Sequence, residues 1–258
     1  MTSSLSPVLF DPPLVNPSPN GLFGAVSWAD ESGPTRWLGP GVDVRVWNYN
    51  LAESFGVWTA DVCAPFDLEP TDVKEAGDRP EWPDTFAHFT SWAADNCALT
   101  RPSQVEVQKR AQQTHRLQEP NAVETAFAAR ILADAGTPGT VTDIVAAVSR
   151  LEAEFAVTNT LGLIHASAEL AAYAAQAQLL VRSGSVLRTP LGHQWVFGGG
   201  YVEALGTTLV ATSPVFGWRG PVTPRTAIRE EWNRFYAIVE RSLVLGYEAP
   251  VGAVTITP

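Results

Sequence analysis

The amino-acid sequence predicts an α+β fold that combines long helices with strands of very unequal length. Apolar residues recur at helical spacing over residues 103–135, and short strand patterns begin near residue 161. A last apolar run of fifteen residues extends from Asn233 to Tyr247, whereas a typical strand has about five or six residues. With 45% hydrophobic residues among 258, the chain can bury a sizeable core.

The charge balance disfavours sequence-specific binding of nucleic acid. The net charge is −10, and the basic residues form no visible cluster that would neutralise phosphates. A chain that merely encloses nucleic acid has no need of such a cluster. The N-terminus lacks the basic segment of a signal peptide, and no apolar stretch reaches the roughly 20 residues of a membrane helix. We therefore expect a soluble protein that is made in the cytoplasm and contacts no membrane.

Neither the cysteines nor the histidines have the spacing of a metal site. Cys63 and Cys97 lie far apart, and we expect two reduced, buried thiols because cysteine is often buried. The sequence leaves a disulfide between them open. The histidines, for which we expect structural or surface roles, are His88, His115, His165 and His193.

Residues 1–36 have the composition of an arm that lies along another surface. They are rich in Pro, Ser, Gly and Asn, and proline favours extended backbone and removes hydrogen-bond donors. Such a segment does not fold alone, yet it carries many large apolar side chains. These are Leu9, Phe10, Leu14, Val15, Leu22, Phe23 and Trp28. An arm that packs on its own subunit or on a neighbour explains both features.

Residues 37–101 predict a long two-stranded excursion with a polar tip. Period-2 alternation indicates a strand at Val42–Trp47, and Thr85–Trp92 is a candidate for the second strand. The acidic, proline-containing stretch Asp67–Pro83 lies between them. Because an isolated hairpin is barely stable in water, this excursion must rest on another surface.

The first long helix is predicted over residues 103–135. Ser103 and Glu106 have the spacing of a capping box, and Gly136 ends the helix. Pro120 lies inside it and should kink or split it, because proline removes one helical hydrogen bond.

After residue 140 short strands alternate with helices. A second helix opens at Thr140–Asp143, and its apolar stripe consists of Ile144, Val148, Leu151 and Phe155. Leu161–Ile164 is a short buried strand, and Ser167 is expected to cap an alanine-rich helix that runs to about Leu180. The other short strands flank the turn Thr189–Gly192 and lie near Thr207–Ala211 and Val215–Trp218.

The closing strands, Asn233–Tyr247 and Val251–Thr257, are expected to complete one mixed sheet. The side chains of the longer strand should alternate, with Phe235, Ala237, Val239 and Arg241 on one side and Tyr236, Ile238, Glu240 and Ser242 on the other. At about 3.3 Å per residue this strand spans roughly 50 Å, so it should cross between two lobes.

No catalytic constellation emerges from the sequence. Gly198–Gly200 matches neither the dinucleotide-binding fingerprint nor the P-loop, and a glycine turn with positive φ is the better interpretation. Ser167 lacks the flanking glycines of a nucleophile elbow. The remaining carboxylate candidates are expected to be solvated charges: Glu53, Asp61, Glu152, Glu154, Glu230 and Glu231. We therefore predict that the protein is not an enzyme.

These parts, in this order, resemble the major capsid proteins of tailed phages of the Hong Kong 97 type, whose fold encapsulins share. Leu163–Ser167 with its following helix looks like the axial-domain strand and helix of the family, and Thr189–Tyr201 looks like its small turn and strand. Glu231–Tyr247 followed by Val251–Ile256 looks like the closing pair, and Gln104–Ala133 like the spine helix. Within the family, the chain is most similar to capsid proteins of phages that infect actinobacteria.

The resemblance implies five segments. Residues 1–36 would be the N-terminal arm, residues 37–101 the extended loop with part of the peripheral domain, and residues 102–140 the spine helix of the peripheral domain. Residues 141–230 would form the axial domain. Residues 231–258 would form the closing strands, which lie first in the peripheral and then in the axial domain.

The resemblance also implies a function in assembly. Copies would form hexamers and pentamers that close into an icosahedral phage head around double-stranded DNA, in a virion assembled in the host cytoplasm. It implies no cofactor, and the partners would be further copies, with scaffold, portal and decoration proteins as additional candidates. The arm and the loop would lie on neighbouring subunits. The expected contact residues are Phe10, Leu14, Phe23, Trp28, Trp47, Trp58, Trp82 and Phe86.

Three alternatives stay open at this point. An encapsulin-type compartment would share the fold but enclose an enzyme cargo. A phage decoration or minor structural protein would attach to shells without forming them. An enzyme that uses His165 or His193 would belong to a third class.

Overall fold

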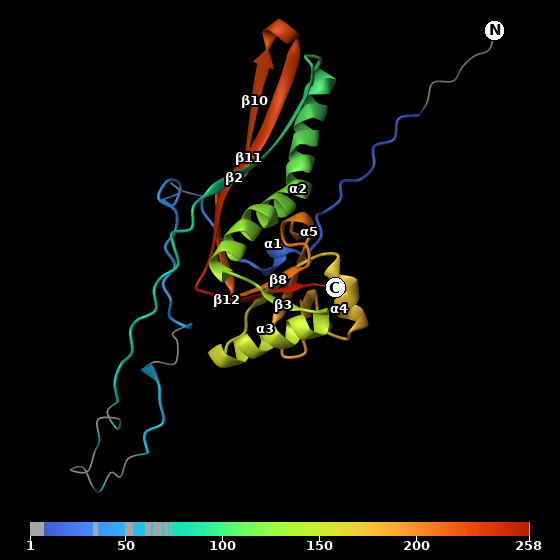
Figure 1. Ribbon diagram of the computed structural model, residues 1–258. Helices are drawn as coiled ribbons and strands as arrows, with labels where there is room; N and C mark the ends of the chain where they lie inside the picture. The colour runs from blue at the N-terminus through green and yellow to red at the C-terminus, as the bar shows by residue number, and fades with distance from the viewer. Residues whose placement is uncertain are drawn as a thin grey trace, which may run out of the picture.

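The computed structural model describes residues 8–32, 36–49, 54–59, 63, 69, 72 and 74–257. Two sheets and one long, bent helix make up the body of the subunit, and two extended segments leave it (Figure 1). One of these segments is the N-terminal arm. The other is a loop that comprises the described residues between 36 and 88 and points away from the body.

The named helices and strands lie within residues 22–30 and 89–256. The helices are α1 (Leu22–Ala25), α2 (Arg101–Ala135), α3 (Ile144–Thr158), α4 (Leu170–Gln176) and α5 (Tyr201–Ala204), and a short 3-10 helix spans Glu230–Trp232. The strands before residue 200 are β1 (Ser27–Asp30), β2 (Phe89–Ala98), β3 (Gly139–Val141), β4 (Leu163–Ser167), β5 (Val181–Ser183), β6 (Val186–Arg188) and β7 (Gln194–Gly198). Those after it are β8 (Thr208–Thr212), β9 (Val215–Arg219), β10 (Thr223–Arg229), β11 (Arg234–Tyr247) and β12 (Pro250–Ile256).

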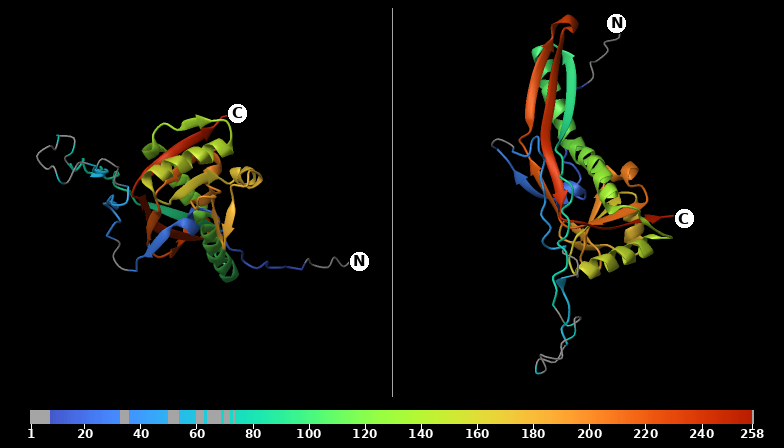
Figure 2. Two further views of the ribbon diagram at one scale, coloured as in Figure 1. Left: turned by 90° about the horizontal axis from the view of Figure 1, so that it is seen from below. Right: turned by 60° about the vertical axis from the view of Figure 1, so that its left-hand side comes forward.

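The five-stranded sheet is organised around β11. This 14-residue strand confirms the predicted long closing strand. Its first part lies between β2 and β10, and its last five residues pair with β9, to which β1 adds in parallel. The strand β10 was missed by the sequence analysis. We call β2, β10 and the first half of β11 the tongue, because they project together with the start of α2 (Figure 2).

One face of the tongue packs on α2, and the predicted alternation along β11 explains this. Phe235, Ala237 and Val239 are buried against Val107 and Ala111 of the helix. Side chains at the intervening positions point to the open face, where Ile238 is 40% exposed. The period-2 pattern of the strand therefore decides which face receives the helix.

The seven-stranded sheet has the order β3-β12-β8-β4-β7-β6-β5 and forms the second half of the body. Helix α3 packs on it through the predicted stripe of Ile144, Val148, Leu151 and Phe155, all of which are buried. Asp143 caps this helix, because its side chain accepts a hydrogen bond from the backbone N–H of Ala146 at 2.9 Å. The predicted second helix is thus confirmed.

The prediction of one mixed sheet that contains both closing strands is wrong. β11 belongs to the five-stranded sheet and β12 to the seven-stranded sheet. The chain turns between them at residues 248–249, where the Ser213 hydroxyl accepts hydrogen bonds from the N–H groups of Glu248 and Ala249. The crossing between the two halves therefore occurs after β11 and not along it. The predicted boundary at residue 230 falls inside the five-stranded sheet, between β10 and β11.

Helix α2 is continuous through Pro120. Figures 1 and 2 show that it bends, which is the effect expected of an internal proline, and it does not split. The predicted capping box is wrong, because the helix begins at Arg101 after Thr100, and Ser103 lies within its first turn. A proline in the first turn is well tolerated, since its missing N–H would have no helical partner there.

Two further short predictions need correction. Val42–Trp47 is not a strand, and its regular pairing is limited to one bridge between Val42 and Phe86. The second predicted strand begins four residues later than expected, as β2 at Phe89. Helix α4 ends at Gln176, before Gln178 adopts a positive φ of 58°.

The two cysteines are exposed, so the prediction of buried thiols is wrong. Cys97 lies near the exposed end of β2, where its thiol interacts with Ser103 at the start of α2. Ser167 caps the turn before α4, since its hydroxyl accepts the N–H of Glu169 at 3.2 Å. It does not cap the helix itself, whose N-cap position is Glu169.

Candidate assembly surfaces

The N-terminal arm exposes its large apolar side chains. Val8, Leu9 and Phe10 are 93%, 90% and 78% exposed, and Leu14 is 51% exposed. The arm is tied to α2 where the Gln113 side chain donates a hydrogen bond to the backbone oxygen of Val15 at 2.9 Å. This link holds the outer part of the arm beside the helix, while Val8, Leu9 and Phe10 stay exposed.

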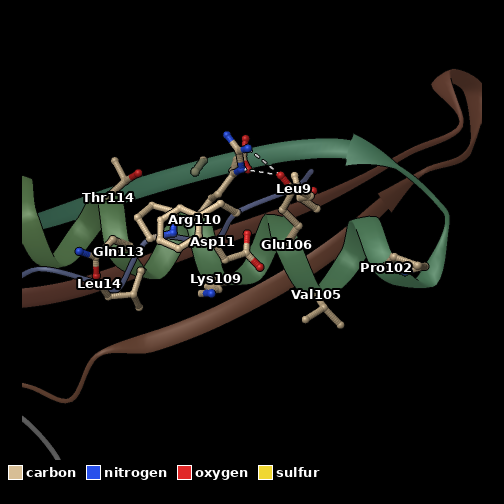
Figure 3. Close-up of a pocket in the computed structure, with 14 residues that line it drawn as sticks. Leu9, Asp11, Leu14, Pro102, Val105, Glu106, Lys109, Arg110, Gln113 and Thr114 are labelled. Atoms are coloured by element: carbon tan, nitrogen blue, oxygen red, sulfur yellow. Dashed lines mark hydrogen bonds and ion pairs between the residues drawn. The ribbon is translucent and has the colours of Figure 1, made fainter. Parts of the chain in front are cut away.

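A hollow separates the arm from the first half of α2 (Figure 3). Its volume is about 880 Å³, and its lining includes Leu9 and Leu14 of the arm and Val105 and Lys109 of the helix. Glu106 and Arg110 form an ion pair on the same helix face. Phe10 and Leu14 therefore lie where a neighbour can reach them, as the sequence predicts, and their contact with a neighbour stays a prediction.

The arm enters the body at Leu22, which is fully buried. Phe23 and Trp28 follow, with ring centroids 4.8 Å apart, and the Trp28 indole N–H donates to the Phe23 backbone oxygen at 3.0 Å. Both rings pack against the core of their own subunit and keep only part of their surface exposed. A role for these two residues in inter-subunit contacts stays a prediction.

The base of the extended loop is anchored in the core through Phe86. This side chain is 2% exposed and packs edge-on against Tyr247 at 5.0 Å between ring centroids. The guanidinium of Arg130 covers its other face, 4.1 Å from the ring centroid. The prediction of Phe86 as an inter-subunit contact is therefore wrong, because its ring is buried within its own subunit. The alternating sequence pattern around Phe86 could not show that its ring turns inward.

Glu248 holds the other side of the loop base. Its carboxylate accepts hydrogen bonds from the backbone N–H groups of Trp47 and Asn48, both at 2.8 Å, and from the Asn48 side chain. Burial raises the pKa of this carboxyl, but the three hydrogen bonds outweigh it and leave the pKa below its ordinary value. The loop is thus attached at the connection between the two sheets.

Three tryptophans of the loop, Trp47, Trp58 and Trp82, are at least partly exposed. Trp47 is 75% and Trp82 54% exposed, and Arg45 lies over the Trp82 ring. The Trp58 indole N–H donates to the backbone oxygen of Asp72 at 2.7 Å, which joins the two sides of the loop. Exposed aromatic rings on a segment without its own core are suited to burial against another chain. Their contact with a neighbour stays a prediction.

A buried carboxylate that the sequence analysis missed joins three parts of the subunit. Glu124 of α2 is 1% exposed and accepts hydrogen bonds from the N–H groups of Leu22 and Gly200, both at 2.8 Å. Burial raises its pKa, and the two hydrogen bonds lower it in part. The arm, α2 and the start of α5 meet at this one side chain.

Gly198–Gly200 are required at this junction for a reason other than the one predicted. None of the three has a positive φ, so the predicted turn conformation is wrong. A Cβ atom at Gly200 would lie 2.1 Å from the Asn121 backbone oxygen, and one at Gly198 would lie 2.6 Å from the Glu124 carboxylate. The glycines permit the close approach of α2.

The two histidines that were considered for catalysis are built into the core. His165 is fully buried between the hydroxyls of Tyr201 and Thr212, at 3.0 and 2.9 Å. Burial lowers its pKa to about 3. His193 stacks on Phe155 with 4.0 Å between ring centroids. The structural roles predicted for both are confirmed.

Within the described residues, no group of three or more His, Cys, Asp or Glu side chains could hold a metal ion. None of the described helices is long and apolar enough to cross a membrane. Glu53 and Asp61, two of the carboxylate candidates, lie outside the described residues.

A bent helix on a long-stranded sheet, a second mixed sheet, an arm and an extended loop together define a capsid-shell fold. No protein-family model and no curated protein matches the sequence. Solved structures match over the full chain. A chain of Mycobacterium phage Adephagia has a TM-score of 0.57 at 14% identity, with 100% of this chain and 96% of that chain covered.

Two other matches are described as shells. The mature capsid of bacteriophage PhiM1 has a TM-score of 0.52 at 11% identity, with 100% of this chain and 92% of that chain covered. The encapsulin from Synechococcus elongatus has a TM-score of 0.50 at 10% identity, with coverages of 98% and 91%. The chain therefore has the Hong Kong 97-type capsid fold, as the resemblance implied.

Proposed function

We propose that this protein is the major capsid protein of a tailed phage. The observation that carries the proposal is the placement of apolar side chains on the two segments that have no core of their own. Phe10 on the arm and Trp47 on the loop are 78% and 75% exposed in the single subunit. Surface of this kind is stabilising only when a neighbouring chain covers it.

Assembly from identical copies accounts for this placement. The arm and loop of each copy would lie on its neighbours, in hexamers and pentamers that close into an icosahedral head around double-stranded DNA. Permanent interfaces of this kind commonly bury about 2,000–5,000 Å². The net charge of −10 suits a wall that encloses DNA without gripping it. Host cytoplasm would be the place of assembly and the virion the final location.

The fold-level matches support the class but include both phage capsids and an encapsulin. In a head, scaffold, portal and decoration proteins would be additional partners. In an encapsulin-type compartment, the lumen would instead hold an enzyme. No catalytic role is proposed for this chain, since its buried histidines are occupied in the core.

The test is negative-stain microscopy of the purified protein combined with size-exclusion chromatography. The expected result is closed shells, or rings of five or six copies. A protein that remains monomeric at high concentration would contradict the proposal and favour a decoration or minor structural protein. Analysis of the shell contents separates the two shell classes, because a phage head contains DNA and a compartment contains a folded enzyme.

A further inference from the structure

The tip of the tongue is an exposed element that the proposed function does not yet use. The 3-10 helix Glu230–Trp232 connects β10 to β11, and Asn233 closes the turn with a φ of 48°. Trp232 is 67% exposed at this end, and both glutamates beside it are exposed. Figure 1 shows the turn at the far end of the subunit from the loop. A large aromatic ring thus follows two exposed glutamates on a short, closed turn.

The two arginines that flank the tip, Arg229 and Arg234, contact residues of the neighbouring strands. Arg229 lies over the Tyr236 ring, 5.0 Å from its centroid. Arg234 donates a hydrogen bond to the Asn96 side chain at 2.6 Å. Neither forms an ion pair with Glu230 or Glu231 in the described structure. The tip therefore offers two carboxylates that are free to meet a cation.

A pocket with the complementary character lies at the bend of α2. It has a volume of about 360 Å³ and is enclosed by the arm, α2, β11 and the connection between β9 and β10. Its apolar walls include Phe23, Val222 and Val239. This volume is in the range of pockets that hold a compact ligand, and it has room for one indole ring.

Three arginines line this pocket, namely Arg116, Arg219 and Arg241. Arg241 is paired with Glu119, and Arg219 is paired with Asp30. Arg116 is exposed and forms no ion pair within the described part of the chain. The pocket therefore combines apolar walls with one cation, Arg116, that has no ion-pair partner among the described residues.

Given the shell-forming role proposed above, we infer that Trp232 of one subunit inserts into this pocket of a second copy, with Glu231 paired to Arg116. An aromatic residue seated in a pocket and framed by charges is the usual form of an interface hot spot. The subunit cannot fill its own pocket. Seven residues of β10 separate Val222 from the tip, which is roughly 23 Å at about 3.3 Å per residue.

The symmetry of such a contact suits a shell. Tip and pocket are different surfaces of one chain, so the contact is heterologous and each copy has one of each to offer. Heterologous contacts build rings and larger arrays, whereas a contact between two identical patches stops at a pair.

The test measures oligomer size by mass photometry and chromatography for the full-length chain and its variants. We expect Trp232→Ala, Glu231→Arg and Arg116→Glu each to reduce assembly at least tenfold at a fixed concentration. Trp232→Phe should retain most of it, because the ring is kept. All three positions are exposed, so the thermal unfolding of the subunit should not change in any of the four variants.

The decisive variant combines Glu231→Arg with Arg116→Glu. Exchanging the two charges restores a complementary pair in every contact, and we expect assembly to recover. Failure to recover, or normal assembly of Trp232→Ala, would overturn the tip–pocket contact while shells of the natural chain still support the capsid function. Small oligomers that depend on Trp232 but never close into shells would support the tip–pocket contact and contradict the capsid function. A natural chain that stays monomeric overturns both.

Discussion

The carboxylate of Glu124 accepts the backbone N–H of Leu22, 102 positions earlier in the chain, at 2.8 Å. Its second oxygen accepts the N–H of Gly200 at the same distance. One side chain of the long helix thus fixes the arm, at the point where it enters the body, to the beginning of α5. Apolar contacts around Leu22 and the hydrogen bonds from Gln113 to Val15 and from Phe197 to Asn20 add to this attachment.

Replacement of Glu124 by alanine should destabilise the subunit. It leaves two buried N–H groups without acceptors, and each such loss costs about 1–3 kcal/mol. We therefore expect a decrease of about 2–6 kcal/mol in the free energy of unfolding, measured by urea denaturation. Glu154→Ala, which removes an exposed carboxylate from α3, is the matched control and should change stability little. Equal effects of both variants would contradict the role of Glu124.

Gly200→Ala should be among the more harmful glycine substitutions in the chain. Its Cβ would lie 2.1 Å from the Asn121 backbone oxygen and 2.9 Å from the Thr125 backbone nitrogen, so α2 must move. We expect a lower yield of folded protein and a lower melting temperature. Gly56→Ala serves as the control, because nothing lies within 4 Å of the new methyl group. A Gly200→Ala protein that melts like the natural chain would show that this approach is not required.

The buried imidazole of His165 should make stability depend on pH. Burial lowers its folded pKa to about 3 from 6.5, so below pH 6.5 the unfolded chain binds a proton that the native protein does not. Stability should therefore fall as the pH drops from 6.5 toward 3, with a slope of up to about 1.4 kcal/mol per pH unit from this residue. Urea unfolding at pH 7.5 and 5.5 measures it.

The comparison variant is His165→Gln, which cannot titrate. It should be less stable at pH 7.5 and should show a smaller loss between the two pH values. His115 and His193 contribute in the same direction, since burial lowers the pKa of both, and their share remains in the variant. An unchanged pH slope would exclude His165 as a source of the dependence.

Removal of the Glu248 carboxylate should release the base of the loop. Glu248→Ala deletes the acceptor for the N–H groups of Trp47 and Asn48, while Val42 and Phe86 stay paired. We expect limited proteolysis within the loop to accelerate several-fold, with little change in the melting temperature. In the natural protein the same release should occur on acidification below about pH 4.5, because the folded pKa is depressed. Glu248→Gln, which keeps one acceptor oxygen, should lie between the two.

Replacement of Phe10 and Leu14 by aspartate should block assembly and leave a folded subunit. Both side chains are largely exposed in the single chain, so their loss removes no core contact. Charges at these positions would oppose burial against a neighbour. Chromatography should show a monomer with unchanged circular dichroism. Normal shells from this variant would count against the role of the arm.

The order of elements could be predicted from the sequence because periodicity is strong in the last hundred residues. The alternation of Phe235, Ala237 and Val239 and the stripe of α3 both reappear as buried faces. The pairing of strands could not be predicted, since β11 and β12 are adjacent in sequence but enter different sheets. The connection between them is held by the Ser213 hydroxyl, which accepts hydrogen bonds from two backbone N–H groups and carries no recognisable sequence signal.

The contact surfaces were harder to predict than the core. Aromatic content marked Phe86 and Trp82 equally, although one is buried and the other is half exposed. Glu124 carried no signal, because a glutamate in a helix normally indicates a solvated face. The glycine run Gly198–Gly200 was the available sequence signal for this junction, since three consecutive glycines allow another segment to approach closely.

The single strand β11 places an unusual limit on how this sequence can change. Its first half positions the tongue against α2, and its last five residues position β9. Insertion of one residue in its middle would reverse the facing of every side chain on one side of the insertion. Length variation between related sequences should therefore concentrate in the loop before β2 and be nearly absent from β11. The length of β11 is therefore expected to be fixed among related sequences, while the length of the loop can vary.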